Sequence, residues 1–72
     1  MKEKNQSLVN LGNNIRKFRE ATGLSQEKLA ALVTLHRNYV GQVERGEVNI
    51  SYLNLIKLAK TLEVGVEDLI KS

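Results

Sequence analysis

The polar side chains with the clearest chemical potential lie between residues 37 and 45. If this segment is helical, Arg37, Asn38 and Gln42 share one side of the helix. Arginine, asparagine and glutamine are the side chains that form paired hydrogen bonds with the edges of guanine or adenine. Gly41 lies on the same side, where the missing side chain leaves room for another surface. This pattern is typical of a helix that reads base pairs, and an ordinary solvated face is the alternative.

Two short helices joined by a tight turn are expected to position these side chains. The first is predicted over Gln26–Val33 and the second over Arg37–Arg45, with the turn at residues 34–36. Ser25 is a suitable N-cap for the first helix, because its hydroxyl can accept a hydrogen bond from a free backbone N–H. Gly46 can take the positive φ that often ends a helix. The apolar residues expected to face the core are Leu29, Ala30, Val33, Leu35, Tyr39, Val40 and Val43.

Three further helices are predicted around this pair, which makes the expected fold all-α. They span about Leu8–Ala21, Tyr52–Leu62 and Val66–Ile70. The chain contains no proline and no alternating apolar run of strand length. We expect one domain over residues 1–72, with residues 1–6 frayed. In the first helix the expected buried stripe is Leu8, Leu11, Ile15 and Phe18, and the expected solvated residues are Arg16, Lys17 and Arg19.

Several segments occur in the order that is typical of a known family. SQEKLA, LHRNYVGQVERG and LNLIKLAKTLEV resemble the Cro/lambda-repressor-type helix-turn-helix family, over about residues 8 to 70. Within it, the run LHRNY…VERGEVNIS resembles the small controller proteins of restriction–modification systems. The resemblance implies a compact five-helix, lambda-repressor-like domain with the helix-turn-helix at its second and third helices. It also implies a transcriptional regulator, repressor or activator, that binds double-stranded DNA sequence-specifically.

Two positions depart from the family pattern. Thr34 and Glu63 stand where the family usually has glycine. A β-branched residue is disfavoured in the left-handed conformation that such a turn requires. We therefore expect the turn at Thr34 and the helix end at Glu63 to be built differently from those of the family.

The resemblance places base recognition at the N-terminal part of the third helix. Arg37 is expected to read guanine, Asn38 either reads adenine or braces Arg37, and Gln42 lies one turn further. Glu44 is expected to pair with a nearby cation, because phosphates repel a carboxylate. In similar proteins the glutamine that begins the second helix and the loop before the fourth helix contact the DNA backbone. The phosphate-binding residues expected here are Gln26, His36, Tyr39, Arg45, Asn49, Ser51 and Tyr52.

Three polar residues have two explanations each. His36 is either the N-cap of the third helix or a phosphate neighbour, and it is the only histidine. Tyr39 either contacts phosphate or is a half-buried core residue. Glu27 either complements the positive end of its helix or, as in some relatives, touches RNA polymerase.

A two-fold homodimer is expected, because one helix-turn-helix reads only a few base pairs. Its half-sites on the DNA would lie about 34 Å apart, one helical turn. A chain of 72 residues also buries a limited core alone, which favours an oligomer. The fourth helix has a broader apolar face than one core contact requires. The expected interface residues are Leu55, Val64, Val66, Leu69 and Ile70.

Composition restricts the remaining function classes. With one histidine, no cysteine and no glycine-rich phosphate loop, the chain offers no catalytic constellation, so no enzyme, metal site or cofactor is expected. No small-molecule ligand is evident. The sequence has no apolar run of membrane-spanning length and no signal-peptide core, so we expect a soluble cytoplasmic protein. The net charge is +3, and the basic excess lies in residues 13–46, which suits a polyanionic partner.

A protein-interaction module of the antitoxin or anti-repressor kind is the alternative function. The broad apolar face of the fourth helix favours it, whereas the basic first half and the polar face of the third helix do not. Salt separates the two hypotheses, because DNA affinity falls steeply as salt rises and a hydrophobic contact barely changes.

Overall fold

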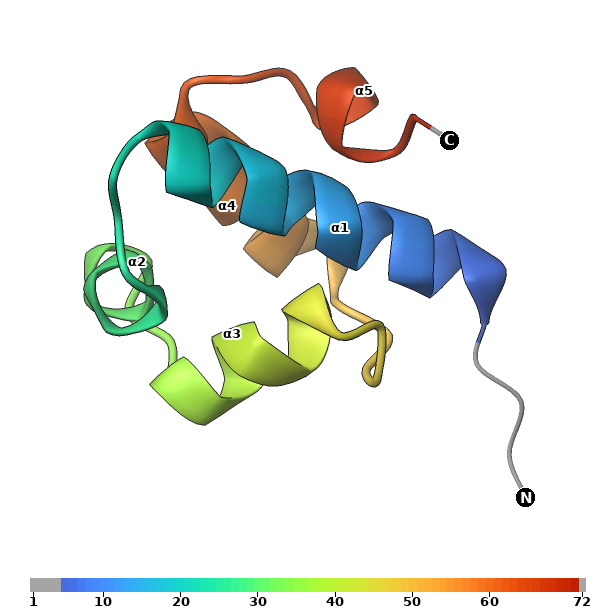
Figure 1. Ribbon diagram of the computed structural model, residues 1–72, viewed down its shortest axis with the longest axis horizontal. Coiled ribbons are helices and arrows are strands. Elements are labelled where there is room, and N and C mark those ends of the chain that lie inside the picture. Colours follow the sequence, from blue (N-terminus) through green and yellow to red (C-terminus); the bar gives the residue numbers. More distant parts are fainter. Residues whose placement is uncertain (1–4, 72) are drawn as a thin grey trace.

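The chain folds into a bundle in which a long first helix lies across the others (Figure 1). The computed structural model describes residues 5–71, and over these residues the helices are α1 (Gln6–Ala21), α2 (Gln26–Leu32), α3 (Arg37–Glu44), α4 (Tyr52–Leu62) and α5 (Val66–Leu69). All regular secondary structure in this range is helical, which confirms the predicted all-α fold. None of these helices has the length and apolar content needed to cross a membrane.

The helix limits lie within two residues of the predicted ones. The largest difference is at the start of α1, which begins at Gln6 rather than Leu8. The Asn5 side chain caps this helix by accepting a hydrogen bond from the N–H of Leu8 at 3.2 Å. Asn5 and Gln6 thus form the start of α1, and residues 1–4, the rest of the segment expected to fray, lie outside the described range.

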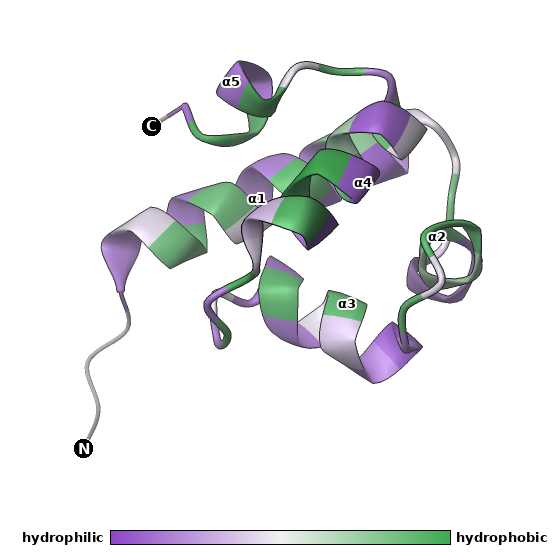
Figure 2. Ribbon diagram, turned by 180° about the vertical axis from the view of Figure 1, so that it is seen from behind, coloured by the Kyte–Doolittle hydropathy of each residue, from purple (hydrophilic) through white to green (hydrophobic). Residues whose placement is uncertain are grey.

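The core takes a fully buried side chain from every helix. These side chains are Ile15 of α1, Leu29 of α2, Val40 of α3, Leu58 of α4 and Leu69 of α5. Burial of each such side chain contributes about 1.5–3 kcal/mol, so every helix is tied to the shared core. α3 is hydrophobic on the side that faces α4 and hydrophilic on the side turned away (Figure 2). The hydrophilic side is therefore free for another surface.

Gly12 fixes how closely α1 approaches α3. A Cβ atom at this position would lie 2.4 Å from the carbonyl oxygen of Val43 and 2.5 Å from that of Glu44. Any side chain would push the two backbones apart. The last turn of α3 is thus held directly against α1, in a contact that the sequence analysis did not anticipate.

The helix ends at Thr34 and Glu63 use the left-handed conformation that glycine usually supplies. Their φ angles are 57° and 59°, against 75° at Gly23 and 74° at Gly46. At Thr34 the helix is closed by hydrogen bonds from Leu35 N to Ala30 O at 2.8 Å and from Thr34 N to Ala31 O at 3.3 Å. Glu63 and both glycines end their helices with the same pair of bonds. The prediction that these two ends are built differently is therefore wrong.

Candidate nucleic-acid interface

The turn between α2 and α3 is built by the residues predicted to cap the two helices. Ser25 Oγ accepts from Lys28 N at 3.0 Å, and His36 Nδ1 accepts from Asn38 N at 3.1 Å. The cap explanation for His36 is thereby confirmed. Since Nδ1 accepts, the neutral imidazole carries its proton on Nε2, which remains available as a donor to an anion.

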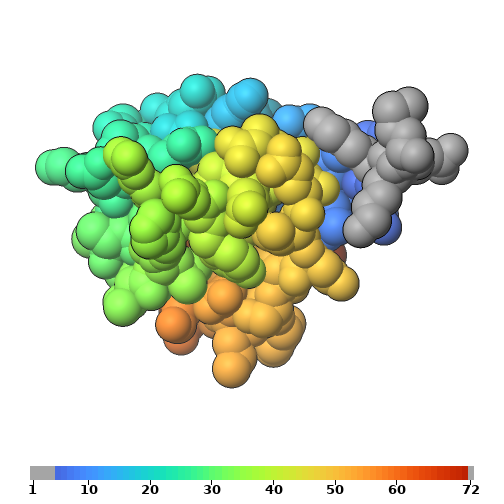
Figure 3. Space-filling model, turned by 90° about the horizontal axis from the view of Figure 1, so that it is seen from below, coloured from blue at the N-terminus to red at the C-terminus, as the bar shows by residue number. Residues whose placement is uncertain are grey.

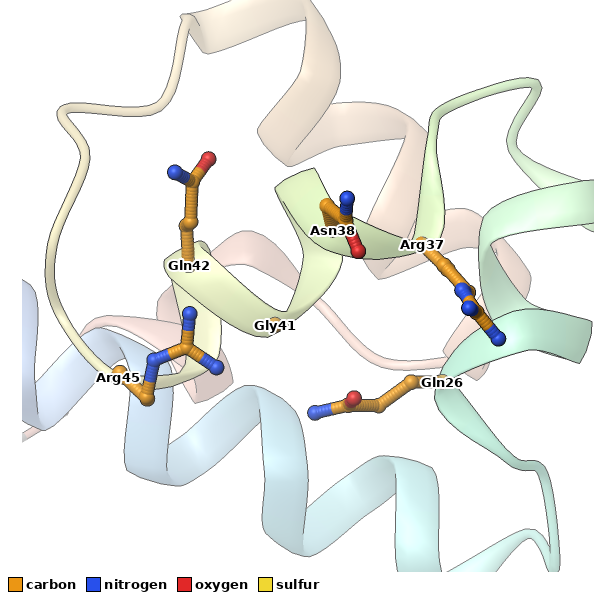
Figure 4. Close-up of a pocket in the computed structure, with 6 residues that line it drawn as sticks. All are labelled: Gln26, Arg37, Asn38, Gly41, Gln42 and Arg45. Carbon is orange, nitrogen blue, oxygen red and sulfur yellow. The ribbon is translucent and has the colours of Figure 1, made fainter.

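The polar face of α3 forms one wall of a shallow concavity (Figure 4). Its volume is about 460 Å³. Figure 4 shows Arg37 and Arg45 toward its two ends, with Gln26 reaching across from α2 and Gly41 on the helix between them. The structure thus brings together the outward residues of α3, the C-cap residue of this helix and the glutamine that begins α2. The lining residues are Gln26, Arg37, Asn38, Gly41, Gln42 and Arg45.

Gly41 is buried by side chains of its own chain. A Cβ atom there would lie 3.1 Å from Arg45 Nη1 and 3.6 Å from Gln26 Oε1. The side chains of Arg45 and Gln26 therefore occupy part of the space that the glycine leaves. The 3.1 Å neighbour is the end of a flexible arginine, which can move aside for a surface that enters the concavity.

Both arginines of the concavity are paired with carboxylates. Arg37 Nη1 lies 3.2 Å from Glu27 Oε2, and both side chains are exposed. Arg45 donates twice to Glu47, from Nε at 2.9 Å and from Nη2 at 3.1 Å. The hydrogen bonds to Glu47 raise the pKa of Arg45 above its ordinary value, and the charge of Glu47 adds to this. Exposed pairs of this kind are weak, so a phosphate or a base edge can displace the carboxylates.

A buried ion pair lies behind the concavity and joins α1 to α3. Arg19 donates from Nε to Glu44 Oε2 at 2.6 Å and from Nη2 to Glu44 Oε1 at 3.0 Å. The Arg19 side chain is 11% exposed and that of Glu44 is 2% exposed. The hydrogen bonds to Glu44 raise the pKa of Arg19, against an opposing contribution from burial. The expected local pairing of Glu44 is confirmed, whereas the prediction that Arg19 is solvated is wrong, because α1 packs this side against α3.

Gln26 is attached to the same carboxylate. Its Nε2 donates to Glu44 Oε1 at 2.9 Å. The side chain is half-buried, and it lies between the concavity and the ion pair. Gln26, Glu44 and Arg19 therefore form a polar network that links the start of α2 and the end of α3 to α1.

The loop before α4 and the start of that helix offer further polar groups. Asn49, Ser51 and Tyr52 are all exposed. Ser51 Oγ accepts from Asn54 N at 3.2 Å, so its hydroxyl hydrogen remains free to donate. Tyr39 is half-buried against the core. The explanation of Tyr39 as a half-buried core residue is thereby confirmed, and its phosphate contact stays a prediction, because a tyrosine can pack its ring and still present its hydroxyl.

The residues predicted for a dimer interface differ widely in exposure. Leu69 is 0% exposed within the monomer, so it has no surface to offer a partner subunit and its prediction is wrong. Ile70 is 60% exposed. Leu55, Val64 and Val66 are half-buried and pack against their own core.

Leu53 was missed by the sequence analysis. It is 70% exposed, on the first turn of α4. An available signal was that Leu53 lies off the buried stripe of this helix, which includes Leu58, Ala59 and Leu62. An apolar residue on the outward side of an amphipathic helix is a candidate contact for a partner.

Relatives of known type match most of the chain. The family model for helix-turn-helix proteins matches residues 15–69. Control protein C.SmaI of Serratia marcescens is 47% identical over 60 residues, which cover 83% of this chain and 71% of that protein. The crystal structure of the restriction-modification controller protein C.AhdI from Aeromonas hydrophila is 48% identical, with a TM-score of 0.87 over 90% of this chain and 98% of that chain. SinR, the master regulator for biofilm formation, was crystallised in complex with DNA and is 29% identical, with a TM-score of 0.80 over 85% of this chain and 98% of that chain.

These matches agree with the geometry of the α2–turn–α3 unit. The matched range contains both helices of the unit and its caps. The likeness to C.AhdI confirms the compact five-helix, lambda-repressor-like fold. The family consists of transcription factors and not of enzymes. The chain belongs to the Cro/C1-type helix-turn-helix family of DNA-binding transcriptional regulators.

Proposed function

We propose that this regulator is the controller of a restriction–modification system and binds a two-fold-symmetric operator as a homodimer. The similarity to controller proteins C.SmaI and C.AhdI supports the first part. The observation that carries the second part is the concavity on α3, where donors for base edges are flanked by donors for phosphate. A regulator of this size needs a second copy to read an operator of useful length.

In the proposed complex α3 lies in the major groove. Arg37 forms a bidentate pair with guanine, and Asn38 either pairs with adenine or braces Arg37. Gln42 reaches a base one turn further along the helix. Arg37 has to leave Glu27 for this contact, and the exposure of both side chains makes that exchange inexpensive.

Phosphate contacts on both sides of α3 would fix its register in the groove. At the start of α3 the donor is the Nε2 proton of His36. Toward the end of α3 lie the second N–H of the Gln26 amide, Arg45 and the start of α4, whose free backbone N–H groups favour an anion. The full proposed set is Gln26, His36, Tyr39, Arg45, Asn49, Ser51 and Tyr52.

A second copy is proposed to pack on the exposed apolar residues of α4 and the C-terminal segment. Leu53 and Ile70 are the exposed members, with Leu55, Val64 and Val66 beside the core. Figure 3 shows the face that carries α3, with the orange residues at the start of α4 projecting at its edge. A two-fold axis near that edge would place both copies of α3 on one side of the dimer. The half-sites would then be about 34 Å apart.

Glu27 is proposed to contact RNA polymerase at promoters that the protein activates. Its carboxylate is exposed on the first turn of α2, beside the DNA-facing surface. Glu27→Gln should lower activated transcription in a purified system while the affinity for the operator does not fall. Unchanged activation would assign Glu27 to the helix terminus alone.

Selection of bound duplexes from a random DNA pool tests the proposed function. We expect enrichment of a two-fold-symmetric motif at about 150 mM salt, where non-specific binding is weak. The affinity for that motif should fall by about 10³-fold or more between 50 and 200 mM salt. Absence of enrichment, with no salt dependence, would instead favour the protein-interaction module.

A further inference from the structure

We propose that Glu44 is a positioning residue that holds Gln26 ready for its phosphate contact, an inference that rests on the proposed function. Glu44 lies on the recognition helix but faces away from the groove surface and is 4% exposed. It therefore cannot touch DNA itself. Its effect on DNA binding would pass through the side chain of Gln26.

The contacts of Glu44 divide into a structural pair and one further hydrogen bond. Oε2 accepts from Arg19 Nε, and Oε1 accepts from both Arg19 Nη2 and Gln26 Nε2. An ionised carboxylate has about four acceptor positions, so it can hold all three donors at once. The ion pair with Arg19 would exist without Gln26, which makes the third contact separable from the first two.

The chemistry of the carboxylate fixes how the Gln26 amide is turned. An ionised carboxylate only accepts, so the amide nitrogen and not the amide oxygen has to face Glu44. One Nε2 hydrogen is used in that bond at 2.9 Å. The other Nε2 hydrogen then has a defined direction and stays available for phosphate. The amide oxygen is left beside Gly41, 3.6 Å from the position of a Cβ atom there.

A glutamine that is already ordered loses less conformational freedom when it binds. The side chain of Gln42 serves as an internal comparison, because it is exposed and makes no side-chain hydrogen bond among the described residues. The two glutamines line the same concavity. In the free protein the side chain of Gln26 should therefore be more rigid than that of Gln42. Only the rigidity of Gln26 should depend on Glu44.

The paired change Arg19→Met/Glu44→Met separates positioning from folding. Replacing both members of a buried ion pair with apolar residues of similar length is often neutral for stability, whereas removing one member leaves an unpaired charge. The double change also leaves the net charge of the protein unaltered. It removes the acceptor for Gln26 and also the hydrogen bond from Arg19 Nη1 to Leu24 O at 2.9 Å, while the volume behind the concavity stays filled. The stability of the variant in chemical denaturation is therefore measured beside its affinity.

The test measures affinity for a mixed-sequence duplex, longer than two turns of the double helix, at about 50 mM salt, where phosphate contacts dominate binding. Gln26→Ala should weaken binding by about tenfold, the change expected for one lost charge-assisted hydrogen bond. Arg19→Met/Glu44→Met should weaken it several-fold. Adding Gln26→Ala to that pair should then have little further effect. In such a double-mutant cycle, the effects of the Met pair and of Gln26→Ala on affinity would not add. This result would indicate coupling between Glu44 and Gln26 and not a general loss of fold.

Each other outcome overturns a specific statement. If the wild-type chain binds no duplex, the proposed function fails. If Gln26→Ala weakens binding but the Met pair does not, the positioning role of Glu44 is wrong and Gln26 acts alone. Equal effects of Gln26→Ala in both backgrounds would also exclude coupling.

A second measurement needs no variant. Nuclear magnetic relaxation of the side-chain amides reports their order on the picosecond-to-nanosecond timescale. The Gln26 amide should be ordered in the free wild-type protein and the Gln42 amide mobile. Equal mobility of the two would show that the bond to Glu44 does not persist, and would overturn the inference.

Discussion

At the scale of single residues, both arginines of the surface proposed to face DNA are already paired with carboxylates in the free chain. Arg37 is paired with Glu27, and Arg45 with Glu47. Because the pKa of Arg45 is raised, its charge would be lost only as pH rises through that higher value. Changes of pH near neutrality therefore cannot break the pair by deprotonating the arginine. Substitution of the carboxylates is the way to test what the pairs do.

Arg37→Ala tests the assignment of base reading. The variant should lose about 1–3 kcal/mol of binding at the selected motif and relax the preference at one base position. The reason is that a bidentate arginine–guanine pair discriminates against the other bases. Repeating the duplex selection with the variant measures this directly. An unchanged base preference would mean that α3 is docked differently.

Glu47→Gln should increase affinity for DNA by a few-fold. Glu47 holds Arg45 through two hydrogen bonds, so its carboxylate competes with phosphate for the guanidinium. Binding of a mixed-sequence duplex at low salt measures the change. Glu67→Gln on α5 removes the same charge far from α3 and is the matched control. If both variants gain equally, net charge and not release of Arg45 is the cause.

At the scale of helices, local signals were sufficient for much of the fold. The cap at Ser25 and the periodic apolar residues placed the helix limits, because these signals act within a few positions of the chain. The burial of Arg19 could not be found in this way. Its partner Glu44 is 25 positions away, and the contact depends on how α1 crosses α3. The same holds for the close approach at Gly12, which only packing reveals.

Thr34→Gly should stabilise the protein, because Thr34 carries a positive φ at the end of α2. The left-handed conformation costs an L-residue about 1–2 kcal/mol, and glycine avoids this cost. Glycine also has more conformational freedom in the unfolded chain, which lowers the stability of the folded state by about 0.5–1 kcal/mol and offsets part of the gain. A net gain of up to about 1.5 kcal/mol is expected in chemical denaturation. Thr34→Ala keeps the Cβ atom and should gain much less. A loss of stability with glycine would show that the Thr34 side chain makes a compensating contact.

At the scale of the whole molecule, the distribution of exposed apolar residues decides how copies can meet. Leu53 and Ile70 are exposed at the start of α4 and at the end of the described chain, whereas Leu32 is exposed on α2. The sequence pointed to α4 and the C-terminal segment, but it selected Leu69, which the monomer buries completely. The periodicity of apolar residues identifies an apolar helix face, but it does not show which residues of that face are buried in the core of the same chain. The described fold supplies that missing information.

Leu53→Asp is therefore the sharpest test of the proposed dimer. A carboxylate at this exposed position should leave the monomer core intact but disfavour burial against a second copy. Sedimentation equilibrium should show the variant as a monomer at concentrations where the wild-type chain is a dimer. Affinity for the two-fold motif should fall as well, since each half-site would then bind separately. Leu32→Asp makes the same change on another exposed leucine and should leave both quantities unaltered. If Leu32→Asp dissociates the dimer and Leu53→Asp does not, the interface lies on α2, and the spacing of the two recognition helices has to be derived from that surface instead.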